Sequence, residues 1–64
     1  ATGMTQKYFR QIQRARQAAD LLQNGINAIA VAYETQYADQ AHMSRSLKHI
    51  LGYTPTEITL LKNL

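Results

Sequence analysis

The chain has 64 residues, a net charge of +3 and no cysteine. A chain of this length can form one domain with a small core, and the lack of cysteine excludes disulfides and thiolate–metal sites. The longest apolar run is far shorter than the roughly 20 residues that span a bilayer, and no signal-peptide pattern appears, so we expect no membrane partner. Since the chain opens with Ala1 rather than methionine, we expect it to have been processed, tagged or cut from a longer protein.

Residues 6–23 are predicted to form the first helix. Their apolar side chains recur every three or four residues, which is the period of a helix with one face in a core. Thr5 is a suitable N-cap, and Gly25 can adopt the left-handed conformation that closes a helix. The predicted apolar stripe consists of Phe9, Ile12, Ala15, Ala18, Ala19, Leu21 and Leu22.

Residues 28–36 are predicted to form a second, shorter helix with Asn27 as its N-cap. Alanine occupies three of the first five positions of this segment. Alanine favours helix formation, and its small side chain also lets a neighbouring helix cross at close range. The segment therefore suits a tightly packed pair of helices.

Residues 40–51 are predicted to form a third helix, with Asp39 as its cap and Gly52 at its end. Its apolar positions share one face and comprise Met43, Leu47, Ile50 and Leu51. The opposite face carries side chains that suit base edges and phosphates, namely Gln40, His42, Arg45, Lys48 and His49. This helix is the strongest candidate for a nucleic-acid contact in the sequence.

A fourth helix is predicted over residues 55–63. Thr54 and Glu57 have the spacing of a capping box, and Pro55 occupies the first helical position, where proline is favoured. Ile58 and Leu61 would face the core. The predicted fold class is therefore all-α, a small helix-turn-helix (homeodomain-like) bundle of about four helices.

Six of the seven lysine and arginine residues fall into two groups. The first group consists of Lys7, Arg10, Arg14 and Arg16, and the second of Arg45 and Lys48. Residues 21–38 between them carry only one charge, that of Glu34. Two basic surfaces on so short a chain favour an extended anion over a point ligand.

Two short segments of the chain parallel each other. Gly3–Phe9 and Gly52–Ile58 both read glycine, a bulky residue and threonine, with a bulky apolar residue four positions after the threonine. Chance is one explanation for a match of this length. The other is a duplicated architecture, in which the first helix follows an upstream helix-turn-helix as the last helix follows this one.

The chain resembles the DNA-binding region of AraC-type bacterial transcription regulators, from Gly3 to about Ile58. The residues that carry the resemblance are Gly3, Met4, Thr5, Phe9, Leu21, Leu22, Gly25, Tyr37–His42, Ser44, Arg45, Lys48 and Gly52–Pro55. The family's DNA-binding region has two helix-turn-helix subdomains joined by a long helix. The resemblance implies that residues 1–25 form the joining helix and residues 26–64 the second subdomain, with the first subdomain and the effector domain absent.

The sequence departs from the family pattern at several positions. Gln36 replaces a usual glycine at the turn, where a positive φ would cost a non-glycine residue up to ~1–2 kcal/mol. Gln6 stands where proline is usual. Met43, Leu47 and Ile58 stand where the family more often has aromatic residues.

The function that the resemblance implies is sequence-specific DNA binding, with helix 40–51 in the major groove. There Arg45 can donate two hydrogen bonds to guanine, and His42 can donate or accept. The expected base contacts are Gln40, Ala41, His42 and Arg45. The expected phosphate contacts are Ser44, Lys48, His49, Arg10 and Arg14. For each of them the alternative is an ordinary solvated polar face, and for Arg10 and Arg14 the two readings weigh equally.

We expect no enzymatic activity, cofactor or metal site. His42 and His49 lie about two helical turns or ~10 Å apart, too far to share a metal, and no glycine-rich phosphate loop or paired carboxylates occur. The resemblance implies a bacterial, cytoplasmic, nucleoid-associated protein that contacts double-stranded DNA and RNA polymerase. The alternative is a helical protein-interaction or dimerisation module, self-associating through an apolar face at Phe9, Ile12, Ala19 and Leu22.

Overall fold

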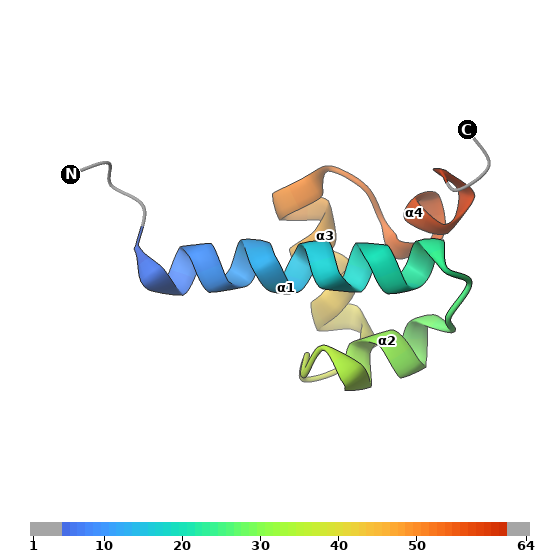
Figure 1. The fold of residues 1–64 in the computed structure, drawn as a ribbon, viewed down its shortest axis with the longest axis horizontal. Helices are drawn as coiled ribbons and strands as arrows, with labels where there is room; N and C mark the ends of the chain where they lie inside the picture. The colour runs from blue at the N-terminus through green and yellow to red at the C-terminus, as the bar shows by residue number, and fades with distance from the viewer. Residues whose placement is uncertain (1–4, 62–64) are drawn as a thin grey trace.

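The computed structural model describes residues 5–61, and this part of the chain consists of four α-helices and no strand. The helices are α1 (Gln6–Gln23), α2 (Ala28–Glu34), α3 (Gln40–Leu51) and α4 (Pro55–Leu61). Helix α1 runs along the molecule and packs against each of the other three, while α2 also packs against α3 (Figure 1). The predicted all-α class is confirmed, and α2 and α3 form the helix-turn-helix pair.

The helix boundaries follow the sequence except at the end of α2. This helix was predicted to reach residue 36 but ends at Glu34, with Thr35 as its C-cap. The reason is that Gln36 has a φ of 64° and so cannot continue a right-handed helix. The last two positions predicted for α4, residues 62–63, lie outside the described residues.

Polar side chains cap the helices as predicted. Thr5 and Asn27 each accept a hydrogen bond from a backbone amide two or three residues later. Asp39 accepts from the backbone amide of His42, with 2.7 Å between Oδ1 and N. Thr54 and Glu57 form the reciprocal capping box, with distances of 2.8 and 3.2 Å. These bonds satisfy amide groups that have no partner within the helix.

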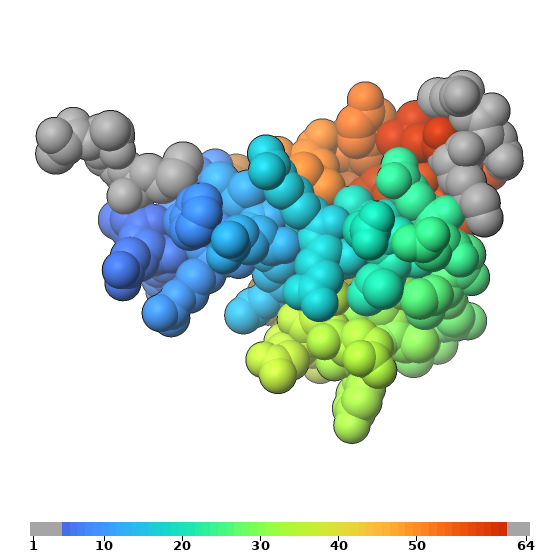
Figure 2. Space-filling view, in the orientation of Figure 1, coloured from blue at the N-terminus to red at the C-terminus, as the bar shows by residue number. Residues whose placement is uncertain are grey.

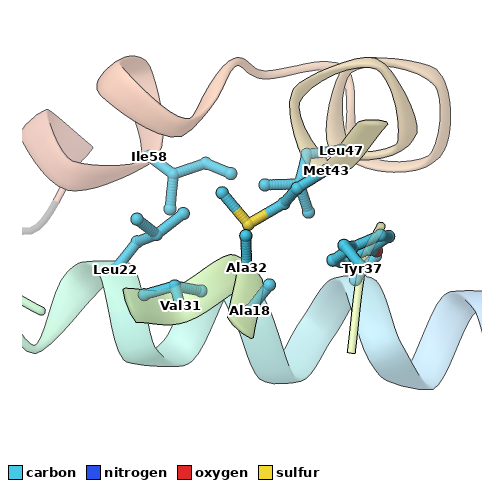
Figure 3. Close-up of a cluster of buried hydrophobic side chains, with 9 residues drawn as sticks. Ala18, Leu22, Val31, Ala32, Tyr37, Met43, Leu47 and Ile58 are labelled. Carbon is cyan, nitrogen blue, oxygen red and sulfur yellow. The ribbon is translucent and has the colours of Figure 1, made fainter. Parts of the chain in front are cut away.

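The core lies where the four helices meet (Figure 3). Its buried side chains come from every helix and are Ala15, Ala18, Leu22, Val31, Ala32, Tyr37, Met43, Leu47 and Ile58. The Met43 side chain reaches toward Leu22 and Ile58 (Figure 3). The alanines on α1 and α2 allow close approach, as the composition of α2 predicted. Among residues 5–61, Thr35 is the one buried polar residue outside this apolar cluster. Its hydroxyl donates a hydrogen bond to the carbonyl of Val31 at 2.7 Å.

Two parts of the predicted apolar faces are less buried than expected. Phe9 is 51% exposed and Ile12 only half-buried, so the N-terminal part of the α1 stripe contributes little to the core. This end of α1 extends beyond the other helices (Figure 1) and stands clear of them in the space-filling view (Figure 2). At 100° per residue Phe9 also points about 140° away from the buried Leu22. Ile50 and Leu51 at the end of α3 pack against the core but are half-buried.

Gln36 occupies the left-handed position that closes α2. The amide of Gln36 donates to the carbonyl of Tyr33 at 3.1 Å, and that of Tyr37 donates to Ala32 at 3.0 Å. These two bonds, with Tyr37 packed into the core, form a Schellman motif, in which glycine is the usual residue at the left-handed position. The turn therefore has the geometry that a glycine would favour, although the residue is glutamine.

We predict that Gln36→Gly stabilises the domain. Glycine removes the ~1–2 kcal/mol cost of the left-handed conformation but adds roughly 0.5–1 kcal/mol of backbone entropy to the unfolded chain. The net gain should be up to about 1 kcal/mol, measured as a rise in the thermal unfolding midpoint. Gly52→Ala is the matched control of opposite sign, because φ is +86° there and an added Cβ meets no atom within 4 Å. A thermal unfolding midpoint for Gln36→Gly below that of the wild type would contradict the prediction that the left-handed conformation of Gln36 is strained.

The capping box also makes stability depend on pH. The hydrogen bond from the backbone amide of Thr54 lowers the pKa of Glu57 below its ordinary 4.5 and outweighs the opposing effect of desolvation. The Thr54 side chain and the charge of Lys48 lower this pKa by smaller amounts. A carboxyl with a lowered folded pKa contributes stability above its unfolded pKa and loses it as pH falls through the folded pKa. We predict that Glu57→Gln, which keeps an acceptor but cannot titrate, flattens the loss of stability below about pH 4.5. Thermal melts across the acid range check this, and equal slopes for both proteins would argue against it.

Candidate nucleic-acid interface

The outer face of α3 is open to solvent over its whole length. Met43 and Leu47 are fully buried, and at 100° per residue they turn Ala41, Arg45 and Lys48 to the opposite side. The side chains of Gln40, Ala41, His42, Arg45, Lys48 and His49 are all exposed, whereas Ser44 is half-buried. Most of the residues predicted to contact DNA therefore share one accessible surface.

A hollow between α1 and α3 brings basic and polar side chains of both helices together. Arg14 from α1 lines it together with Arg45 and His49 from α3. His42 lines the same hollow, with Ser46 and Gln11 between the charged groups. Helices distant in sequence thus bring two predicted base contacts and two predicted phosphate contacts together.

Gln40 and Ser44 lie on the other flank of α3. They line a second hollow that is shared with the start of α4, where Thr54, Pro55 and Thr56 contribute. Ala41 lines neither hollow. The predicted base contacts are therefore spread across the width of α3, with Gln40 on the side of α4 and His42 on the side of α1.

Two further predicted phosphate contacts lie at the edges of this surface. Arg10 is exposed and lines a separate hollow along α1 with Lys7 and Arg14, one turn before Arg14. Lys48 is exposed, and its ammonium donates to the carbonyl of Gly52 at 3.4 Å. A cation at that place also offsets the negative end of the α3 dipole. Both groups extend the basic surface beyond the hollow between α1 and α3.

Tyr37 supports this surface from the buried side, a role that the sequence analysis did not assign to it. The guanidinium carbon of Arg14 lies 5.5 Å from the centroid of the Tyr37 ring. The Tyr37 hydroxyl is 3.2 Å from Oγ of Ser46, and the ring meets the His42 imidazole edge-on at 5.3 Å. Tyr37 thus links α1 to two turns of α3. Its position two residues before Asp39, the cap of α3, was the only local signal of such a role.

The described residues offer little for other kinds of site. Within residues 5–61, no three His, Cys, Asp or Glu side chains are grouped so that they could hold a metal ion. In the same part of the chain, none of the helices has the length and apolar character needed to cross a bilayer. The surface that remains is polar, basic and carried by a helix with an open outer face.

Comparison with known protein families agrees with this geometry. The model of a family described as a helix-turn-helix domain, of the AraC type, matches residues 1–59. The chain belongs to the AraC-type helix-turn-helix family. Neither the curated proteins nor the solved structures contain a significant match to it. The resemblance to AraC-type regulators that the sequence indicated is confirmed.

Membership in this family establishes the general kind of function. AraC-type helix-turn-helix domains are DNA-binding domains of transcription regulators, and the family is typically non-enzymatic. The domain described here is thus a DNA-binding domain of that kind. Its fold places α2 and α3 as the helix-turn-helix and α1 as the helix that both pack against.

Proposed function

We propose that the chain binds double-stranded DNA sequence-specifically, with α3 lying in the major groove. The observation that carries this proposal is the exposed outer face of α3, which presents Arg45 and His42 beside Arg14 of α1. The major groove of B-DNA is about 12 Å wide and admits an α-helix. In helix-turn-helix proteins the first turns of the second helix contact the base edges.

The base contacts are assigned to the first two turns of α3. Arg45 donates two hydrogen bonds to the O6 and N7 of a guanine, a contact worth ~1–3 kcal/mol of discrimination. Ala41, at the centre of the exposed face, contacts a thymine methyl group. Gln40 bonds an adenine from the flank near α4, and His42 contacts a base from the flank near α1.

The phosphate contacts are assigned to the rim of the same surface. Arg14 and His49 lie along the hollow between α1 and α3, and Arg10 continues the basic surface along α1. On α3, the Lys48 side chain is exposed and that of Ser44 is half-buried. Such contacts fix the orientation of the helix on the duplex but carry no sequence information.

We also propose that α1 joins this subdomain to another helix-turn-helix. Thr5 caps α1 through a hydrogen bond to the amide three residues later, as Thr54 caps α4. Within the described residues, the two segments that parallel each other in sequence thus share a threonine cap. The apolar residue that follows is buried in α4, at Ile58, but 51% exposed in α1, at Phe9. A preceding subdomain would bury Phe9, and a complete regulator of this kind would contact RNA polymerase at a promoter.

The proposal is tested by titrating labelled duplexes selected from a random pool against a scrambled duplex over a series of salt concentrations. Three of the proposed phosphate contacts, Arg10, Arg14 and Lys48, carry a charge, which predicts that log K falls with log salt at a slope of roughly −3. We expect tighter binding of the selected duplex at every salt concentration. Equal binding of both duplexes would refute sequence-specific recognition, and a flat salt dependence would refute the phosphate contacts.

A protein-interaction module is the second candidate, favoured by the exposure of Phe9 and of Tyr8, which is 42% exposed. The apolar face available to a partner is smaller than the sequence suggested, because Leu22 is only 1% exposed and Ala19 packs against the core. Sedimentation equilibrium without DNA separates the candidates. A dimer that Phe9→Asp dissociates would support the interaction module.

A further inference from the structure

The side chain of His42 is exposed, yet two neighbours contact its ring and a third fixes its backbone. Its backbone amide donates to Oδ1 of Asp39 at 2.7 Å. Its ring nitrogen Nδ1 accepts a hydrogen bond from the backbone amide of Ala38 at 3.4 Å. The Tyr37 ring meets the imidazole at 90°, with 5.3 Å between the ring centroids.

The bond from Ala38 determines which ring nitrogen carries the proton. A backbone amide can only donate, so Nδ1 must be unprotonated to accept from it. In a neutral imidazole the proton then lies on Nε2, because one nitrogen donates while the other accepts. The ring therefore has its acceptor turned inward, toward the turn before α3, and its donor free.

The ring itself lies on the proposed DNA surface. His42 and Arg45 are three residues apart on α3, one above the other, and both line the hollow beside α1. Tyr37 is itself fixed, since it is buried and its hydroxyl is 3.2 Å from Oγ of Ser46. A side chain held this way loses little conformational entropy when it binds.

We propose that His42 is a specificity-determining residue that reads DNA only as a hydrogen-bond donor, through Nε2–H. Its target is an acceptor on a base edge: O6 or N7 of guanine, N7 of adenine or O4 of thymine. The amino groups of cytosine and adenine are donors and are rejected. This inference rests on the proposed function, because it assigns a chemical preference within the same DNA-binding surface.

Two substitutions test separately Nδ1, which accepts from the Ala38 amide, and Nε2, which is proposed to contact the base. In His42→Asn the short amide can still accept from the Ala38 amide but has no group at the place of Nε2. In His42→Gln an amide reaches the place of Nε2 and can either donate or accept. His49→Asn is the matched control, since it makes the same change two turns further along α3.

The experiment is selection from a random duplex pool with wild type and the three variants. We expect wild type to prefer an acceptor over an amino group roughly three- to tenfold at one base position next to the Arg45 contact. His42→Asn should lose that preference. His42→Gln should bind duplexes with an acceptor or with an amino group at that base position equally well. His49→Asn should bind more weakly overall but keep the preference.

The outcomes separate this inference from the proposed function. If wild type enriches no sequence at all, the proposed function fails and this inference fails with it. If wild type and His42→Asn enrich the same sequence, only this inference fails.

An independent readout comes from long-range proton–nitrogen correlation spectra of the free protein, recorded in alkaline buffer. The ring nitrogens of His42 should show protonated Nε2 and unprotonated Nδ1, with His49 as the internal reference. A proton on Nδ1 of His42, or two nitrogens that average as in His49, would overturn the inference even where DNA binding is intact.

Discussion

Leu47→Ala is expected to remove most of the stability of the domain. Leu47 is fully buried on α3 and belongs to the single cluster to which all four described helices contribute. Truncating such a side chain costs about 2–5 kcal/mol, because transfer free energy is lost and a cavity remains. A domain of this size has a total stability of roughly 3–10 kcal/mol. The variant should therefore unfold at far lower urea concentrations, as followed by the helical circular dichroism signal.

Leu60→Ala is the matched control for this prediction. It makes the same change on α4, but Leu60 is 62% exposed. A surface substitution of this kind changes the free energy of unfolding by about 0.5 kcal/mol or less. If both variants unfolded at the same urea concentration, the cluster in Figure 3 would not be the centre of the fold.

The helices and their caps could be predicted from the sequence because the signals are local. Each of Thr5, Asn27 and Asp39 lies directly before an apolar period and binds an amide within three residues. Such bonds need no knowledge of the tertiary structure. The buried faces of α3 around Met43 and Leu47 followed in the same way, because helical periodicity gives the direction in which a side chain points.

The depth of burial along a helix could not be predicted in this way. Phe9 and Leu22 belong to one predicted stripe of α1, but one is 51% exposed and the other 1%. A stripe spaced by threes and fours drifts around the axis, and at 100° per residue Phe9 points about 140° away from Leu22. Periodicity fixes a direction around the axis, whereas burial also depends on where the neighbouring helices end. Since α1 extends past α2, α3 and α4, its first turns have no partner among the described residues (Figure 1).

The candidate site was predictable as a set of residues but not as an arrangement. The exposure of Arg45 and His42 follows from their place opposite Met43 and Leu47 on one helix. The pairing of Arg14 with that surface, and the support from Tyr37, depend on how α1 crosses α3. No local pattern encodes that crossing, because Arg14 and Tyr37 are more than twenty positions apart in the chain.

Arg45→Ala is expected to reduce the preference for the selected duplex over scrambled DNA by roughly 5- to 150-fold. This range corresponds to the loss of a two-bond contact with guanine, worth ~1–3 kcal/mol. Affinity for scrambled DNA should fall much less, because a single charge contributes only one of several phosphate-neutralising groups. Competition titrations with both duplexes measure the two effects separately.

Arg45→Lys distinguishes geometry from charge at this position. Lysine keeps the positive charge and so retains non-specific affinity and the slope of log K against log salt. Its ammonium lacks the planar fork that donates two parallel hydrogen bonds to O6 and N7. The expected result is therefore scrambled-duplex binding close to wild type with a preference close to that of Arg45→Ala. If lysine restored the full preference, Arg45 would act as a charge near a phosphate, and the reading of a guanine would have to be assigned to another side chain of α3.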